Sequence, residues 1–187
     1  MTFKDFYLDE KMARWNLPKK KWVSLPLEEL NDDMKQLLWR MYSDSYSRQG
    51  LALNTKNINE LVDKYKVSWF IDVDTDTTPE AFIIYRESPV GNKIALLGTD
   101  DNRLSKRLLV RKLISLLRKP GWYIEASHKI ADIIENKGGK WIDDEEKVKK
   151  ILAPAEIDEW LGDGRYKRTL KGTNIEVTKR LYGNPRG

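Results

Sequence analysis

The chain has 187 residues, a net charge of +5 and no cysteine. Its length suits one domain, with or without an arm, and a hydrophobic content of 40% with seven tryptophans supplies a sizeable core. The lack of cysteine excludes disulfides, thiolate metal sites and cysteine nucleophiles, and it favours an intracellular setting. The acidic N-terminal residues and the lack of any run of roughly 18 apolar residues lead us to expect neither a signal peptide nor a membrane span.

The first third of the chain contains two helical patterns and two strand patterns. We expect residues 1–26 to form an irregular arm, because they contain prolines and three consecutive lysines. Apolar residues in 27–42 recur at a spacing of three and four, which predicts a helix, and a shorter helix is predicted over 58–65. Aromatic and β-branched residues predict strands at 67–73 and 80–86, joined by a turn.

The rest of the chain alternates strands and helices. The predicted elements are a strand at 93–97, a helix at 103–118, a strand at 122–126, a helix at 127–137, a charged helical insertion at 144–161 and a hairpin formed by 166–170 and 175–181. This order predicts a single α/β domain over 27–187, with a mixed central sheet flanked by helices and a C-terminal β-hairpin.

The segment from Gly91 to Trp141 contains a strand, a basic helix, a strand, a helix and a glycine turn. In this order it resembles the GNAT superfamily of acetyl-CoA-dependent N-acyltransferases. The resemblance implies a cofactor cleft between the two strands, with the pyrophosphate at the N-terminus of the basic helix. The following helix in that family often carries Asn-x-x-Ala-x-x-x-Tyr-x-x-x-Gly-Phe. Counting back from Gly139 places Ala131 on the alanine, His128 on the asparagine and Glu135 on the tyrosine.

The resemblance implies a set of positions that contact acetyl-CoA. They are Leu97, Arg103, Leu104, Ser105, Lys106, Arg107 and His128. The family has a glycine-rich loop here, whereas this chain has no glycine between Gly98 and Gly121. Two interpretations stay open: backbone donors at the helix N-terminus still bind the cofactor, or the segment is an ordinary capped helix with Asp100 and Asp101 at its start.

Candidate catalytic residues lie on the strand at 122–126. Tyr123, Glu125 and Ser127 alternate onto one face, and the chain's single histidine follows at His128. For an acyltransferase, Glu125 or a water that it holds would act as the base, and Tyr123 or Tyr166 as the acid. The alternative is that Glu125 pairs with an arginine or lysine and that His128 begins a helix. Glu135 would be an ionised, solvated carboxylate that cannot replace the family's tyrosine as acid.

Basic residues concentrate in two segments. Residues 162–187 hold seven basic and two acidic residues and so carry the whole net charge of +5. The helix 103–118 carries four arginines on one face: Arg103, Arg107, Arg111 and Arg118. Both segments suit phosphate recognition, with Tyr166 and Tyr182 available for stacking. Equally, the arginines could pair with the acidic insertion, and the tail could be a hairpin whose outer face is solvated.

An acidic run resembles a calcium loop only superficially. It comprises Asp72, Asp74, Asp76 and Glu80, and it lacks the glycine and glutamate that such a loop requires at its sixth and twelfth positions. We therefore expect a hairpin tip there and no metal site.

Three functions stay open at this point. The first is a GNAT-like N-acyltransferase that moves acetyl from acetyl-CoA to an amine on a protein or small molecule. The second is a non-catalytic GNAT-fold protein of a phage particle, or one that interacts with a host protein. It is suggested because the tryptophan-rich, cysteine-free chain with its Tyr-Gly-Asn-Pro tail resembles GNAT-like proteins of tailed bacteriophages. The third is a nucleic-acid-binding protein that uses 103–118 and 162–187. The implied location is the host cytoplasm or the virion.

Overall fold

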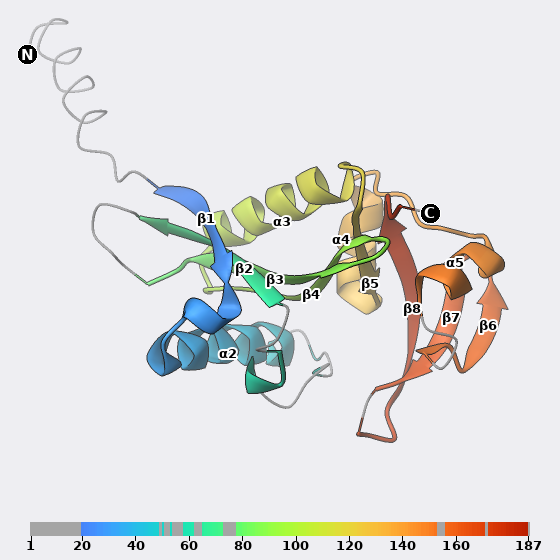
Figure 1. Ribbon diagram of the computed structural model, residues 1–187, viewed down its shortest axis with the longest axis horizontal. Coiled ribbons are helices and arrows are strands. Elements are labelled where there is room, and N and C mark those ends of the chain that lie inside the picture. The colour runs from blue at the N-terminus through green and yellow to red at the C-terminus, as the bar shows by residue number, and fades with distance from the viewer. Residues whose placement is uncertain are drawn as a thin grey trace, which may run out of the picture.

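An eight-stranded mixed sheet forms the centre of the molecule, and four α-helices accompany it within the described residues (Figure 1). The computed structural model describes residues 20–48, 50, 53, 58–61, 65–72, 78–152, 156–170 and 172–186. The strands follow the order β1-β2-β3-β4-β5-β8-β7-β6, and only β4 and β5 are parallel neighbours. The predicted α/β class with a mixed sheet is therefore confirmed. No helix in the described part of the chain is long and apolar enough to cross a bilayer.

The elements have the following bounds. The strands are β1 (Lys20–Pro26), β2 (Tyr65–Asp72), β3 (Ala81–Ser88), β4 (Gly91–Thr99), β5 (Trp122–Ala126), β6 (Glu159–Gly162), β7 (Arg165–Thr169) and β8 (Glu176–Gly183). The helices are η1 (Leu27–Glu29), α2 (Asp32–Ser47), η2 (Ile58–Leu61), α3 (Arg103–Leu117), α4 (His128–Asn136) and α5 (Glu145–Ile151).

The N-terminal prediction is wrong for residues 20–26, which form the edge strand β1 and not an irregular arm. β1 pairs antiparallel with β2 from Lys20 to Pro26, and the ring of Trp22 packs 5.6 Å from that of Phe70. Lysine and proline in this strand suit an edge, where one side of the strand has no neighbour to pair with. The remainder of the predicted arm, residues 1–19, lies outside the described residues.

Three predicted helical segments start later or are shorter than expected. The pattern at 27–42 begins as η1, and α2 starts only after Asn31, whose side chain accepts a hydrogen bond of 2.8 Å from the Met34 N–H. The helix expected at 58–65 is the single turn η2, and β2 already begins at Tyr65. In the predicted helical insertion 144–161, α5 ends at Ile151 and the segment finishes as β6.

Helices cover the sheet and enclose two clusters of buried side chains. Figure 1 shows α2 below strands β1 to β4 and α3 above them. The main core contains Leu38 and Tyr42 of α2, Phe82 and Ile83 of β3, and Leu113 of α3. A smaller cluster lies beside α5 and consists of Tyr123, Val148, Leu152, Tyr166 and Leu181.

The parallel strands β4 and β5 meet at one end and part at the other. They pair only through Asn92–Trp122, Lys93–Tyr123 and Ile94–Ile124. At the joined end, the Asn92 N–H donates a hydrogen bond of 2.6 Å to the carbonyl oxygen of Gly121. Beyond Ile94 and Ile124 the two strands continue without pairing, and this parting opens the sheet.

Gly91 is required where the two strands meet. Its φ of +129° suits glycine, and a Cβ there would overlap the carbonyl oxygen of Gly121. We therefore expect Gly91→Ala to destabilise the fold by about 2 kcal/mol or more in urea unfolding. The control is Gly138→Ala, at φ +74° in open space, which should lose only about 1 kcal/mol. Equal losses in the two variants would show that the Gly91–Gly121 contact does not matter.

Candidate functional site

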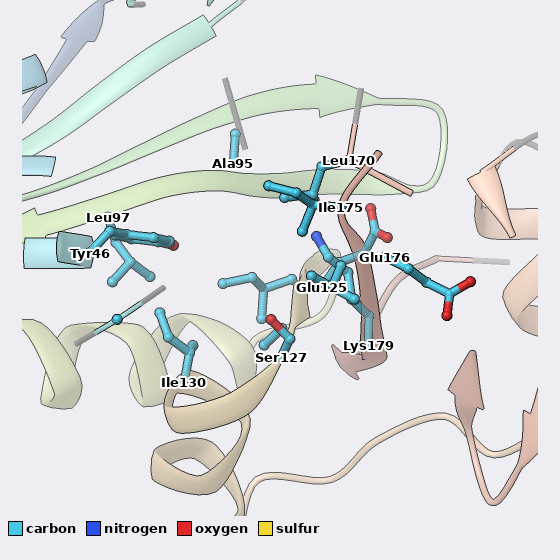
Figure 2. A pocket seen from close by; sticks show the side chains of 14 residues that line it. Tyr46, Ala95, Leu97, Glu125, Ser127, Ile130, Leu170, Ile175, Glu176 and Lys179 are labelled. Atoms are coloured by element: carbon cyan, nitrogen blue, oxygen red, sulfur yellow. The ribbon is translucent and has the colours of Figure 1, made fainter. Parts of the chain in front are cut away.

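A cavity of 230 Å³ lies where β4 and β5 part (Figure 2). Ala95 and Leu97 of β4 and Ile124 of β5 supply apolar walls, while Glu125 and Lys179 supply opposite charges. In Figure 2 the side chains of Glu125 and Lys179 lie close together on one side of this space. The cavity therefore combines an apolar wall with an ionisable pair, which is the composition of a small-molecule or catalytic site.

Glu125 is held by cationic and hydroxyl donors from two other strands, β4 and β7. Its carboxylate forms an ion pair with Lys93 of β4. Arg168 of β7 donates from Nη1 to both carboxylate oxygens at 2.7 Å, and the Tyr166 hydroxyl donates to Oε2 at 2.9 Å. The Glu125 side chain is only 4% exposed. The predicted alternative that Glu125 pairs with an arginine or lysine is therefore what the structure contains.

These neighbours keep Glu125 ionised. Burial raises the pKa of the Glu125 carboxyl, but the charges of Lys93, Lys179 and Arg168 outweigh burial and hold that pKa well below its usual range. A carboxylate with a lowered pKa is a weak base. The surroundings of Glu125 therefore conflict with the base role predicted for it and suit a residue that organises cations around the cavity.

Lys179 is the unexpected member of the site. It is 6% exposed and follows Val177 and precedes Leu181 in the buried phase of β8. Among the described residues, its ammonium group makes no hydrogen bond and has no carboxylate within ion-pair distance. Burial lowers the pKa of Lys179, while Glu125 opposes this effect and Arg168 and Lys93 add to it.

Neither of the two tyrosines predicted as acids is among the residues that line the cavity. The Tyr123 hydroxyl is 3.0 Å from Oγ of Ser88, and Tyr123 packs in the small cluster beside α5. Burial and the Glu125 carboxylate raise the pKa of Tyr166, so this phenol retains its proton. Tyr46 of α2, which the sequence prediction omitted, does line the cavity.

A second cavity of 370 Å³ opens between α3 and α4. Its walls are apolar and contain Leu97, Leu109, Val110, Leu113, Ile130 and Ile133. Three cationic residues also line it, namely Arg48, Lys106 and Lys129. Leu97 and Ile130 line both cavities, so the two cavities are neighbours.

The N-terminus of α3 is capped by the chain's own side chains. Asn102 accepts a hydrogen bond of 2.8 Å from the Leu104 N–H, and Asp101 pairs with Lys106 at 2.7 Å and with Arg48 at 3.6 Å. The helix is thus capped, with Asn102 rather than either aspartate as the N-cap. A phosphate group at this place would meet side-chain cations in place of a glycine-lined backbone cradle.

The remaining predicted cofactor positions divide into two groups. Arg103, Leu104 and Arg107 are exposed, whereas Ser105 is fully buried and its hydroxyl group has no hydrogen-bond partner among the described residues. His128 begins α4, as the alternative predicted, and its side chain lies outside the described residues.

Glu135 cannot donate a proton as the family's tyrosine would. It accepts hydrogen bonds from the Tyr182 hydroxyl at 2.5 Å and from Arg180 Nη1 at 2.9 Å. The hydrogen bond from Tyr182 lowers the pKa of Glu135, so it is ionised as predicted. Arg180 in turn lies 4.2 Å over the ring of Trp141.

Several basic residues of segment 162–187 form ion pairs with acidic side chains. The pairs are Lys167 with Glu159 and Glu176, Arg168 with Glu125 and Glu156, and Arg180 with Glu135 and Asp163. The arginines of α3, by contrast, are exposed and pair with no acidic side chain in the part of the chain that the structure describes. The expected pairing with the acidic insertion is therefore not observed, and α3 carries the available positive charge.

The acidic run at 72–80 mostly lies outside the described residues. Glu80 pairs with Lys20 of β1. Among the residues that the structure describes, no group of three acidic or histidine side chains could hold a metal ion.

Sequence reasoning therefore identified neither Lys93 and Arg168 as the partners of Glu125 nor Lys179 as a buried amine in the same cavity. One signal was available: Lys179 occupies an inward position in the alternating strand pattern of β8. The other two could be found only after the strand order was known.

Two of the solved structures that are similar to this chain are acetyltransferases. No family model matches the chain, and no curated protein matches it. The ribosomal-protein-S18-alanine N-acetyltransferase from Escherichia coli is similar with 13% identity and a TM-score of 0.48, over 89% of this chain and 93% of that chain. An acetyltransferase from Bacillus subtilis, solved in complex with CoA, is similar with 11% identity and a TM-score of 0.45, over 88% of this chain and 99% of that chain.

Glu125→Gln should destabilise the fold by about 3 kcal/mol at pH 7, because it leaves buried cations without a counter-charge. The lowered pKa of Glu125 means that its contribution is present above the ordinary carboxyl pKa of 4.5 and is lost as pH falls below it. Urea unfolding at pH 7 and about pH 3 should therefore show the wild type losing more stability on acidification than the variant.

Glu87→Gln is the matched control, since Glu87 pairs with Lys66 on the exposed surface and should change stability by less than about 1 kcal/mol. If the two substitutions had equal effects at pH 7, the buried cluster would contribute no more than a surface pair.

Proposed function

We propose that the protein is a GNAT-like N-acyltransferase that transfers acetyl from acetyl-CoA to an amine. The observation that carries this proposal is the parting of β4 and β5, which leaves a charged cavity between the strands. The second cavity adjoins it between α3 and α4. An extended thioester substrate needs such a pair of neighbouring spaces, one for its acyl end and one for its arm.

The residues of the second cavity fit coenzyme A in kind. Leu109, Val110 and Ile133 offer an apolar wall for the pantetheine arm. Arg48, Lys106 and Lys129 line the same space and would pair with its phosphates. Acetyl-CoA supplies the activated acyl group, and the chain's own residues bind it, exclude water and handle the acceptor's proton.

The proposal departs from the family pattern at the phosphates. Side-chain cations replace the backbone amides of a glycine loop, and Asp101 neutralises part of that charge. Binding should consequently weaken with added salt more than an amide-lined site would. The acceptor amine would enter the cavity beside Lys179.

Isothermal titration of acetyl-CoA should give micromolar binding, with no heat from ATP and retained binding of desulfo-CoA. Lys106→Met and Lys129→Met should each weaken binding about tenfold, because each removes one charge-assisted contact to phosphate. Lys150→Met, on exposed α5, is the control and should bind as the wild type does. An absence of heat at high acetyl-CoA concentration would mean a non-catalytic domain of this fold.

A second candidate function is the binding of nucleic acid through α3. The helix contains no acidic residue, and its exposed arginines make no ion pair among the described residues. Guanidinium groups one turn apart could contact successive phosphates.

Fluorescence anisotropy with a labelled duplex tests this second function. The affinity should fall steeply with salt, and Arg103→Gln with Arg107→Gln and Arg111→Gln should reduce the slope of log K against log salt by about one per arginine. Arg165→Gln on exposed β7 is the control. Binding that is insensitive to salt would reject this function.

A further inference from the structure

Among the described residues, the side-chain amine of Lys179 has no hydrogen bond and no ion pair. Glu125, a buried carboxylate that lines the same cavity, has its oxygens engaged by Lys93, Arg168 and Tyr166. Lys179 itself is almost fully buried. Figure 2 shows its side chain extending from β8 toward the cavity beside Glu125. A buried amine without a counter-ion destabilises the folded state unless it is neutral or meets a ligand.

We infer that Lys179 is the general base of this cleft, whose amine accepts the proton that the acceptor must lose before it attacks the acyl carbon. The inference rests on the proposed acyl transfer. The base is therefore Lys179 of β8 and not Glu125 of β5, because the Glu125 carboxylate is already paired with Lys93 and Arg168.

Charged groups from every neighbouring strand act on Lys179. Glu125 of β5 and Glu156 before β6 favour the ammonium form, whereas Arg168 of β7 and Lys93 of β4 disfavour it. Burial is the largest effect and lowers the pKa of Lys179, so the neutral amine is populated closer to neutral pH than on the surface. A base is most effective when its pKa approaches the working pH.

The proton balance of the reaction is complete with this residue. Lys179 Nζ takes one proton from the acceptor ammonium and becomes an ammonium itself. The freed acceptor nitrogen forms a bond to the acyl carbon, and the carbon–sulfur bond breaks. The second proton of the acceptor nitrogen passes to the departing thiolate, and Lys179 returns its proton to solvent. The products are an amide and CoA thiol.

The first measurement concerns the free protein and needs no acceptor. Brief acetylation with acetic anhydride across a pH series, read by mass spectrometry, gives the reactivity of each lysine. Lys179 should become reactive at a lower pH than the exposed residues Lys137 and Lys140, and acetyl-CoA or CoA should protect it but not them. A midpoint equal to that of the exposed lysines, or no reaction at any pH, would overturn the inference.

The second measurement follows thiol release from acetyl-CoA with spermidine, tyramine or a short peptide as acceptor. The assay has no background from the chain, because it contains no cysteine. Lys179→Met and Lys179→Arg should each lower kcat by about 100-fold or more with acetyl-CoA binding unchanged. They should also remove the acidic limb of the pH profile. Thr178→Ala, an exposed neighbour on β8, should behave as the wild type.

Thermal unfolding separates a base from a structural counter-ion. Lys179→Met should melt at the same temperature as the wild type or higher, because it removes an unpartnered buried amine. A clear loss of stability with an unchanged pH profile would assign Lys179 to charge balance and overturn the inference. If acetyl-CoA does not bind the wild type at all, it is the proposed transferase function that fails.

Discussion

The buried carboxylate of Glu125 joins strands that are far apart in the chain. β5 is short: three residue pairs link it to β4 and four link it to β8. In the strand order, β5 lies between the half formed by β1 to β4 and the half formed by β8, β7 and β6. Glu125 adds ionic bonds from β5 to Lys93 of β4 and Arg168 of β7, near the place where backbone pairing between β4 and β5 stops. Ion pairs therefore link these strands close to the point where their backbone ladder ends.

The same cluster sets the chemistry of the cavity. A carboxylate that balances several cations cannot also serve as an effective base, since its pKa is lowered by the charges that it holds. Three cations surround it, and two of them pair with it directly. The third, Lys179, is buried and has no direct partner among the described residues. Retaining such an amine opposes stability, and natural proteins keep groups of this kind mainly where function requires them.

The N-terminus of α3 and the adjoining second cavity differ in their electrostatics from a glycine-rich phosphate loop. A glycine loop binds phosphate with backbone amides, which are rigid and uncharged. Here Asn102 consumes an amide of α3, and Arg48, Lys106 and Lys129 surround the adjoining cavity. Long cationic side chains lose more conformational entropy when they close on an anion. They are also screened by salt. The outer face of α3 extends this positive surface with arginines that have no acidic partner among the described residues.

Local patterns in the sequence determined the central elements. Strand β5 matches its predicted bounds, and α3 and α4 end within one residue of theirs, because apolar periodicity and glycine or proline stops are local properties. Residues 20–26 form β1 and residues 159–162 form β6 because each segment pairs with a partner strand. Local propensity carries no information about such pairing. Glu125 was identifiable from the alternation of β5. Its neighbours come from β4, β7 and β8. Only the tertiary structure could therefore show that the carboxylate forms ion pairs and that, among the described residues, Lys179 forms none. The sequence determines the charge of a residue and its position along the chain. The solvation and the counter-ions of that residue depend on which strands become neighbours. Solvation and counter-ions together decide which group can accept a proton.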